Sequence, residues 1–302
     1  MEIREFDYLI AIAEEGSISG AADRLFMAQS SLSQYLRKYE SELGVKLFVR
    51  TSTGIRPTPT GEVMIRQARR LLSEYRQVKS EIRDIEELKT GKIELGISTF
   101  RGSFMLPKIL IPFRNIYPGV QVEISESNSM NLEQKLMEGK LDMAIVALPL
   151  TKINTDISFL KHDEICIACH RDHPVMEHTK LNKKTDKLYV DMKDAAKYEF
   201  ILSDHDTILG SVARDEFARH NLVPKVCNGN LTAPFALKLA AAGYALAFTY
   251  DSCCEDSSDV RYLSIGQKGI YIKLGIAYPP DGYRSKATIE LSKLFHMFLG
   301  QE

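Results

Sequence analysis

The sequence lacks any apolar run long enough to cross a lipid bilayer, and it contains no low-complexity segment. A membrane-spanning helix needs about 20 predominantly apolar residues, so no such helix is expected. The N-terminus, MEIREFDYLI, carries acids where a secretory signal peptide has Lys or Arg, and it lacks the apolar core of such a signal. We therefore expect a cytoplasmic protein without a membrane partner.

Cysteine is scarce: the chain has five, an odd number, among 302 residues. In a long chain without an export signal, this count predicts reduced thiols rather than a disulfide framework. The sequence also lacks a G-x-S-x-G motif, a phosphate-binding P-loop and an H-E-x-x-H motif. No catalytic constellation is indicated, so we expect neither an enzyme nor a bound cofactor or metal.

What the chain does have is length for two or three domains and a marked charge asymmetry. Residues 1–23 hold one Arg against six acids, whereas residues 24–70 hold nine Lys or Arg against three acids. A single basic block predicts a polyanionic partner. A solvated charged surface is the alternative interpretation.

The basic block contains the stretch AQSSLSQYLRKYE, residues 28–40, which has helical spacing. One stripe of this helix carries Ser30, Ser33, Gln34 and Arg37, and the opposite stripe carries Leu32, Leu36, Tyr39 and Leu43. A shorter helix precedes it in SISGAADRLF, and a two-stranded wing follows in VKLFVRTSTGIRPT. This order predicts a winged helix-turn-helix.

The same segment resembles the DNA-binding domain of LysR-type transcriptional regulators. The matching residues are Gly16, Ser17, Ala21, Ala22, Leu25, Gln29, Ser30, Ser33, Glu40, Leu43, Gly44, Leu47, Phe48, Arg50, Thr58 and Gly61. Two positions depart from the family pattern, which often has Pro at the position of Ser30 and Arg or Lys at that of Gln34. Since Arg favours guanine and Gln favours adenine, the preferred DNA sequence should change accordingly.

The outer face of the third helix and the wing are the expected DNA contacts. Gln29, Ser33 and Gln34 would reach base edges, and the serines at the helix start would lie near phosphate. A merely structural third helix is the alternative. The whole expected set is Ser17, Ser19, Gln29, Ser30, Ser31, Ser33, Gln34, Arg37, Arg50, Thr51, Ser52 and Arg56.

A long helix is predicted from Pro59 to Lys89, with Thr58 as its cap and Pro at its first position. Its apolar residues follow heptad spacing, which predicts a two-stranded coil with a second copy of the chain. The protein would then be a homodimer or homotetramer with paired recognition helices. Packing on the C-terminal domain is the alternative. The seam is Met64, Ala68, Leu71, Tyr75, Val78, Ile82 and Ile85.

Residues 91–302 alternate short strands with amphipathic helices, which predicts parallel sheet covered on both faces. The segments LPKILIPFRNIYPGVQVEI, LMEGKLDMAIV and HPV resemble the effector-binding domain of the same family, which resembles periplasmic binding proteins. The resemblance implies two α/β lobes, lobe I at about 91–162 plus 268–302 and lobe II at about 163–267. We expect an α/β chain overall, with a mainly helical head at 1–58, a linker helix at 59–90 and an effector domain at 91–302.

Hydroxyl-rich loops follow the strands of both lobes, where ligands collect in parallel sheets. They predict a site for a small anion, with Arg101 paired to a carboxylate. Helix capping by these hydroxyls and an exposed loop position for Arg101 are the alternatives. The expected set is Ser98, Thr99, Phe100, Arg101, Ser127, Asn128, Ser129, Leu148, Pro149, Ser203, His205, Thr207 and Thr249.

The segment CIACHRDHPVMEH offers a second interpretation. Cys166-x-x-Cys169-His170 matches a haem attachment motif, and His173 with His178 could complete a zinc set. However, EICIACH has the composition of a strand, on which residues three apart point to opposite faces. Buried free cysteines are therefore favoured.

The sequence thus predicts a DNA-binding transcriptional regulator, with promoter DNA, a small effector, a second copy and RNA polymerase as candidate partners. An effector between the lobes would favour one lobe arrangement and re-space the DNA-binding heads. A thiol- or metal-responsive regulator that uses Cys166 and Cys169 is the alternative.

Overall fold

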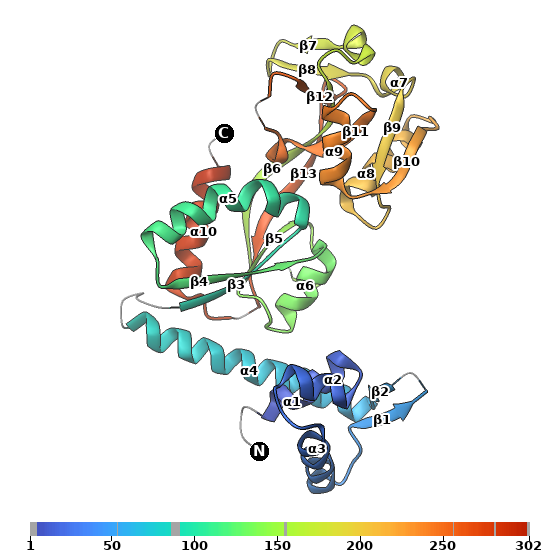
Figure 1. The fold of residues 1–302 in the computed structure, drawn as a ribbon. Helices are drawn as coiled ribbons and strands as arrows, with labels where there is room; N and C mark the ends of the chain where they lie inside the picture. Colours follow the sequence, from blue (N-terminus) through green and yellow to red (C-terminus); the bar gives the residue numbers. More distant parts are fainter. Residues whose placement is uncertain are drawn as a thin grey trace.

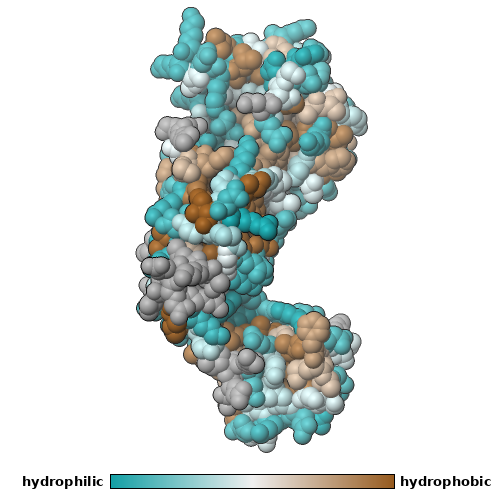
Figure 2. Space-filling model, turned by 60° about the vertical axis from the view of Figure 1, so that its left-hand side comes forward, coloured by the Kyte–Doolittle hydropathy of each residue, from teal (hydrophilic) through white to brown (hydrophobic). Residues whose placement is uncertain are grey.

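The computed structural model describes residues 5–52, 54–85, 91–153, 156–255, 257–280 and 282–300. Figure 1 shows the head at one end, a long helix beneath lobe I, and lobe II at the far end. In the space-filling view the head projects below the rest of the molecule and is joined to it on one side (Figure 2). Among the described residues, no helix combines the length and the apolar character needed to cross a membrane.

The head is a winged helix-turn-helix, as predicted. Its elements are α1 (Glu5–Glu15), α2 (Ile18–Arg24), α3 (Gln29–Leu43), β1 (Phe48–Thr51) and β2 (Gly54–Pro57). Leu9, Ile12 and Leu32 are fully buried at its centre. Gly44 ends α3 in the left-handed conformation, with φ of 69°, which a residue without Cβ adopts at little cost.

The linker helix α4 runs from Pro59 to Ile85, and the remainder of the predicted helix, to Lys89, lies outside the described residues. Thr58 caps it, because its Oγ1 accepts a hydrogen bond from the backbone N–H of Gly61 at 3.0 Å. Ile65 and Ala68 are buried in the core of the head. The first turns of α4 therefore belong to the head, and its later turns leave it.

The effector domain is built on one mixed sheet in the order β10-β9-β11-β6-β13-β5-β3-β4. The strands of this path are β3 (Gly91–Ile97), β4 (Val120–Glu126), β5 (Met143–Leu148), β6 (Ile157–His170), β9 (Glu199–Ser203), β10 (Lys225–Leu231), β11 (Leu246–Tyr250) and β13 (Ile270–Ala277). Both βαβαβ units are parallel, as predicted, but β6 and β13 pair antiparallel and join them.

Helices cover the faces of both lobes (Figure 1). They are α5 (Thr99–Ile116), α6 (Ser129–Met137), α7 (Met192–Ala195), α8 (Ile208–Arg219), α9 (Ala233–Ala241) and α10 (Lys286–Leu299), with short 3-10 turns η1 (Pro174–His178) and η2 (Asp251–Cys253). Three further strands, β7 (Lys180–Asn182), β8 (Lys187–Val190) and β12 (Val260–Ile265), extend lobe II. Each lobe has its own apolar core, and Phe100 at the start of α5 reaches from lobe I into the core of lobe II.

Candidate functional site

The outer face of α3 is open to solvent. Gln29, Ser30, Ser31, Gln34 and Arg37 are all exposed. The residue at the N-cap position of α3 is Ala28, which has no side-chain oxygen to accept a hydrogen bond from the first N–H groups. The first turn also contains no acidic residue, so the positive end of the helix is not neutralised. A helix start of this kind can accept a phosphate.

Two of the predicted DNA contacts are placed differently from the rest. Ser33 is only 7% exposed and lies within 3.4 Å of the amide nitrogen of Gln29, which covers it. The prediction that Ser33 lies on the open stripe is therefore wrong for the free protein, because a small side chain is shielded by its longer neighbour one turn away. Ser17 caps α2 by accepting from the N–H of Gly20 at 3.3 Å, whereas Ser19 is exposed.

The wing is held against α3 by a buried carboxylate that sequence reasoning used only as a family match. Glu40 is 5% exposed, and its oxygens accept the N–H groups of Leu47 at 2.8 Å and Phe48 at 3.1 Å, and the ammonium of Lys46 at 2.7 Å. The signal in the sequence was an acid on the buried stripe of the helix. The expected wing contacts Arg50, Thr51, Ser52 and Arg56 are exposed.

The predicted seam of α4 divides into two parts. Ala68 is fully buried and Met64 is partly buried, and both pack on the head of the same chain. Ala68 cannot face a second copy, because it is enclosed in the head's core, and Met64 is partly covered by the same core. The remaining apolar side chains stand uncovered in the described chain: Leu71, Tyr75, Val78 and Ile82 are 41–57% exposed. Ile85 is the last described residue of the helix.

A cleft of about 620 Å³ lies between the two lobes. Nine of the predicted effector contacts line it: Ser98, Thr99, Phe100, Arg101, Ser127, Asn128, Ser129, Pro149 and Thr207. Four do not, namely Leu148, Ser203, His205 and Thr249. Ser203 and Thr249 are buried inside their strands, Leu148 packs in the core of lobe I, and the His205 side chain is 81% exposed beside Asp204.

Four helices begin at this cleft, and they differ in how their first N–H groups are satisfied. Asn128 and Thr207 cap α6 and α8 with side-chain hydrogen bonds, as the capping interpretation predicted. Ser98 and Thr232, which precede α5 and α9, make no side-chain cap bond. One uncapped helix start therefore comes from each lobe, and both line the cleft.

The start of α9 is a part of the cleft that the sequence analysis missed. Thr232, Ala233 and Pro234 line it, together with Asp204 and Asp206 from the loop before α8. The strand β10 ends at Leu231, directly before Thr232. The Thr-Ala-Pro sequence after β10 was the available signal, because Pro favours the first turn of a helix.

Arg101 lines the cleft without being a free cation. Its side chain is 4% exposed, and Nη2 lies 3.3 Å from Oδ2 of Asp163. The guanidinium carbon lies 3.8 Å from the ring centre of Tyr250, so the group stacks on an aromatic face. Asp163 also accepts from the backbone and hydroxyl of Ser252. Arg101 therefore links α5 to lobe II, and a ligand carboxylate would have to share it with Asp163.

The cysteines of the alternative interpretation are both buried in β6. Burial raises the pKa of Cys169 to about 12 and raises that of Cys166 well above its usual value. Neither thiol is therefore a thiolate at neutral pH, the form that reacts with oxidants and binds metals.

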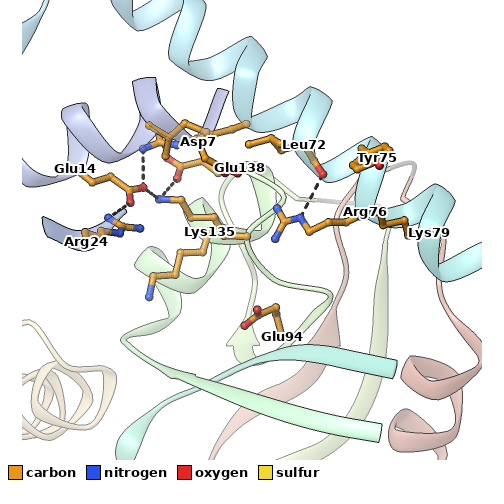
Figure 3. A pocket seen from close by; sticks show the side chains of 13 residues that line it. Asp7, Glu14, Arg24, Leu72, Tyr75, Arg76, Lys79, Glu94, Lys135 and Glu138 are labelled. Atoms are coloured by element: carbon orange, nitrogen blue, oxygen red, sulfur yellow. Dashed lines mark hydrogen bonds and ion pairs between the residues drawn. The ribbon is translucent and has the colours of Figure 1, made fainter. Parts of the chain in front are cut away.

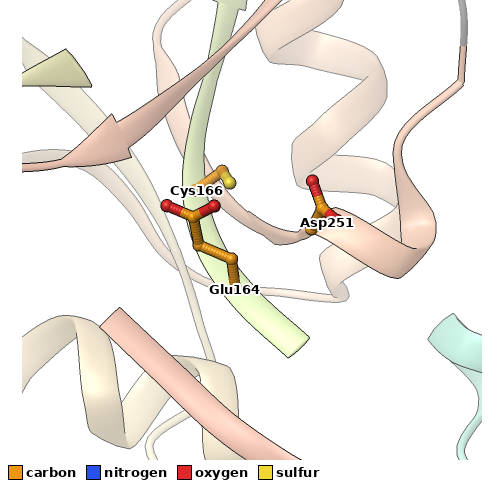
Figure 4. Close-up of side chains that lie close together, drawn as sticks. All are labelled: Glu164, Cys166 and Asp251. Atoms are coloured by element: carbon orange, nitrogen blue, oxygen red, sulfur yellow. The ribbon is translucent and has the colours of Figure 1, made fainter. Parts of the chain in front are cut away.

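One possible metal-ligand cluster exists among the described residues. Figure 4 shows Glu164, Cys166 and Asp251, with one ligand atom of each within 4.8 Å of the others. The ammonium of Lys187 already donates to Glu164 at 2.9 Å and to Asp251 at 3.1 Å. The ammonium of Lys187 therefore already supplies a positive charge to these two carboxylates.

Comparison with known proteins agrees with this arrangement of domains. Residues 3–62 match the family described as bacterial regulatory helix-turn-helix protein, lysR family, and residues 86–297 match the LysR substrate binding domain. The transcriptional regulator BenM of Acinetobacter baylyi is 30% identical over 250 residues, which cover 82% of this chain and 79% of BenM.

Two solved structures share the fold. A full-length OxyR variant from Pseudomonas aeruginosa has a TM-score of 0.69 at 21% identity and covers 98% of each chain. Full-length CbnR in complex with its target DNA has a TM-score of 0.62 at 19% identity, covering 98% of this chain and 100% of CbnR.

Proposed function

Because this chain belongs to the LysR family of DNA-binding transcriptional regulators, we propose that it is controlled by a small anionic effector bound between lobes I and II. The single observation that carries this proposal is the pair of uncapped helix starts, at α5 and α9, that line one cleft from opposite lobes. Each helix start carries about half a positive charge. The first turn of α5 offers N–H groups throughout, whereas that of α9 lacks one at Pro234.

An anion placed between the two starts would bind both lobes at once. It would therefore favour the lobe arrangement in which both starts face it, and a ligand shifts an equilibrium only through such a difference in affinity. Three carboxylates, those of Glu133, Asp204 and Asp206, also line the cleft and oppose a second negative charge. A monoanion is accordingly a better fit than a dianion.

The DNA contacts are proposed as the exposed members of the expected set on α3 and the wing. Gln29, Gln34 and Arg37 would face bases and backbone from the helix, and Arg50 and Arg56 would hold the backbone from the wing. The exposed apolar side chains of α4 are proposed to pair with those of a second copy, which would present two recognition helices together.

The effector proposal can be tested with Thr232→Asp. Asp is a good helix cap, so the variant should fold, yet its charge neutralises the start of α9 inside the cleft. Ser285→Asp makes the same change at the cap of α10, which does not line the cleft. We would screen the full-length chain by thermal shift with small monocarboxylates, each beside its amide, and measure hits by calorimetry.

We expect a carboxylate to bind and its amide to bind at least tenfold more weakly, which corresponds to about 1.4 kcal/mol. Thr232→Asp should weaken the carboxylate by at least the same factor, and Ser285→Asp should leave it unchanged. Equal binding of carboxylate and amide, or of the two variants, would contradict the anionic site.

A further inference from the structure

The loop between α6 and β5, residues Glu138, Gly139 and Lys140, lies against the head and the linker helix of the same chain. Figure 3 shows its side chains together with those of α1, α2 and α4. The polar contacts between this loop and the head or α4 join residues that are more than 60 positions apart in the sequence. The loop is therefore the place where lobe I meets the DNA-binding domain.

Four charged side chains form a closed ring at this contact. Arg69 of α4 donates to Glu14 of α1 at 3.1 Å and lies 3.3 Å from Glu138 of the loop. Lys140 lies 3.2 Å from Glu138 and donates to Glu14, which closes the ring. Arg24 of α2 adds a third cation to Glu14, at 2.9 Å.

The ring is partly shielded from water and its charges alternate in sign. The side chains of Arg69, Glu14 and Glu138 are 19–23% exposed, and that of Lys140 is 33% exposed. Burial by itself would raise the pKa of Glu14, but hydrogen bonds from Lys140 and Arg24 hold it below its usual value. The Glu14 carboxylate is therefore charged at neutral pH and holds its place in the ring.

A second contact, one hydrogen bond and one close steric approach, holds the same loop against α4. Arg76 donates to the backbone oxygen of Gly139 at 2.7 Å. Gly139 has a φ of +63°, and a Cβ at this position would lie 2.2 Å from Oγ of Ser73. The loop can approach the helix this closely only because residue 139 is glycine.

Most of the α4 face proposed for dimerisation points away from lobe I. At 100° per residue, Leu71 and Val78 lie on the side of the helix opposite Arg69, Ser73 and Arg76. Tyr75 borders the docked side, because it lines the crevice between α4 and lobe I. Contact with lobe I and contact with a second copy can therefore exist together. The recognition helix α3 also stays uncovered (Figure 1).

We propose that Glu14, Arg69, Glu138 and Lys140 form a polar latch that fixes the angle of the head relative to lobe I, and so sets the spacing of the two DNA half-sites that a dimer can bind. An apolar contact would hold the head permanently. A ring of partly exposed ion pairs is weakened by salt and can open without uncovering apolar surface. The contacts of the latch form without any group bound in the cleft.

The first experiment measures the latch without DNA or effector. Lys140→Glu places a carboxylate beside those of Glu14 and Glu138, whereas Lys183→Glu makes the same charge change on an exposed residue of lobe II. Hydrogen exchange of full-length protein is followed in α1 and in the loop at low and high NaCl. We expect the wild type and Lys183→Glu to lose protection only at high salt, and Lys140→Glu to exchange at least fivefold faster at low salt. Equal exchange in all three proteins would overturn the latch.

A steric series gives an independent test. Gly139→Ala introduces both backbone strain and the clash with Ser73, whereas Gly266→Ala introduces the same strain at a φ of +64° with no atom within 4 Å. Removing the opposing side chain in Gly139→Ala with Ser73→Gly should restore docking, because the nearest remaining atom is the Cα of residue 73 at 3.7 Å. We expect faster exchange in α1 for Gly139→Ala only. The same result for Gly139→Ala and Gly266→Ala would refute a contact at this point.

The consequence for DNA is tested on duplexes selected by the wild-type protein from a randomised pool. Versions with one or two base pairs inserted between the half-sites are compared with the selected duplex. We expect the wild type to discriminate against the longer spacings at least tenfold, and Lys140→Glu to reduce this ratio at least threefold while Lys183→Glu keeps it. An unchanged ratio in Lys140→Glu would show that the ring does not set the spacing.

Discussion

Replacing Glu40 by Ala should release the wing from the recognition helix. The substitution leaves the N–H groups of Leu47 and Phe48 without an acceptor and removes the partner of Lys46. Each unsatisfied buried N–H costs about 1–3 kcal/mol, so the loss is about 2–6 kcal/mol. A domain of the head's size has roughly 3–8 kcal/mol of stability in all. The variant should therefore lose about a quarter of this stability at the least, and all of it at the upper end of the range.

The same carboxylate predicts how the head responds to acid. Burial would raise the pKa of Glu40, but the hydrogen bonds from Lys46, Leu47 and Phe48 lower it below the usual value. A carboxyl whose pKa is lower in the folded state than in the unfolded state stabilises the fold at pH values above the unfolded pKa, which is near 4.5. This stabilisation is lost as the pH falls through the pKa of the folded state. The wild-type head should thus weaken below about pH 4.5, and Glu40→Ala should lack this component.

Hydrogen exchange of the Leu47 and Phe48 amides is the direct assay, because it reports local opening in a multidomain chain. At 2 kcal/mol or more, exchange in Glu40→Ala should be at least 30-fold faster than in the wild type. Glu42→Ala is the matched control, since Glu42 is exposed and its one described ion pair is a 3.9 Å contact with Lys38. The affinity of Glu40→Ala for a DNA duplex selected by the wild type should fall together with the protection of these amides. If the two variants exchange alike, the carboxylate does not hold the wing.

The remaining predictions concern DNA, assembly and the thiols. Affinity for DNA should fall linearly with the logarithm of salt concentration, with a slope of about −0.9 for each phosphate contacted; a slope near zero in a filter-binding titration would exclude a phosphate-dominated interface. Replacing Leu71 and Val78 by Asp places charges on the exposed apolar side of α4, so sedimentation should show loss of the dimer; an intact dimer would place the interface elsewhere. DNA binding by the wild type should be insensitive to peroxide, because Cys166 and Cys169 are both buried thiols with a raised pKa. The double variant Cys166→Ser with Cys169→Ser should behave in the same way. A peroxide response in the wild type that the double variant loses would favour the thiol alternative.

The order of elements could be read from the sequence because each depends on local periodicity. Apolar spacing of the helical kind marked α3 and α4, and runs such as LAFTY marked the buried strands. The antiparallel junction of β6 and β13 could not be read in this way. It pairs residues more than 100 positions apart, and nothing in either strand states its partner.

The loops that line the cleft could be predicted from the sequence, but the ion-pair partners of its charged side chains could not. Nine of the expected contacts line it because strand ends and helix starts converge there. The environment of Arg101 was not predictable, since its partner Asp163 comes from a strand 62 residues away. The latch escaped prediction for the same reason: Glu14, Arg69 and Lys140 are ordinary surface charges until the fold brings them together.

The split of lobe I into two stretches of sequence has a consequence for how the chain is made. The strands β3, β4 and β5 leave the ribosome first, but β13, which pairs along β5, follows after more than 100 further residues. Until then one edge of this nascent sheet is open, and open edges are where chains aggregate. Most of lobe II is continuous in sequence and can begin to fold during that interval, and Ile270 and Ile272 of β13 complete its core afterwards. A chain that terminates before Ile270 should therefore accumulate with a largely folded lobe II and an unfinished, aggregation-prone lobe I.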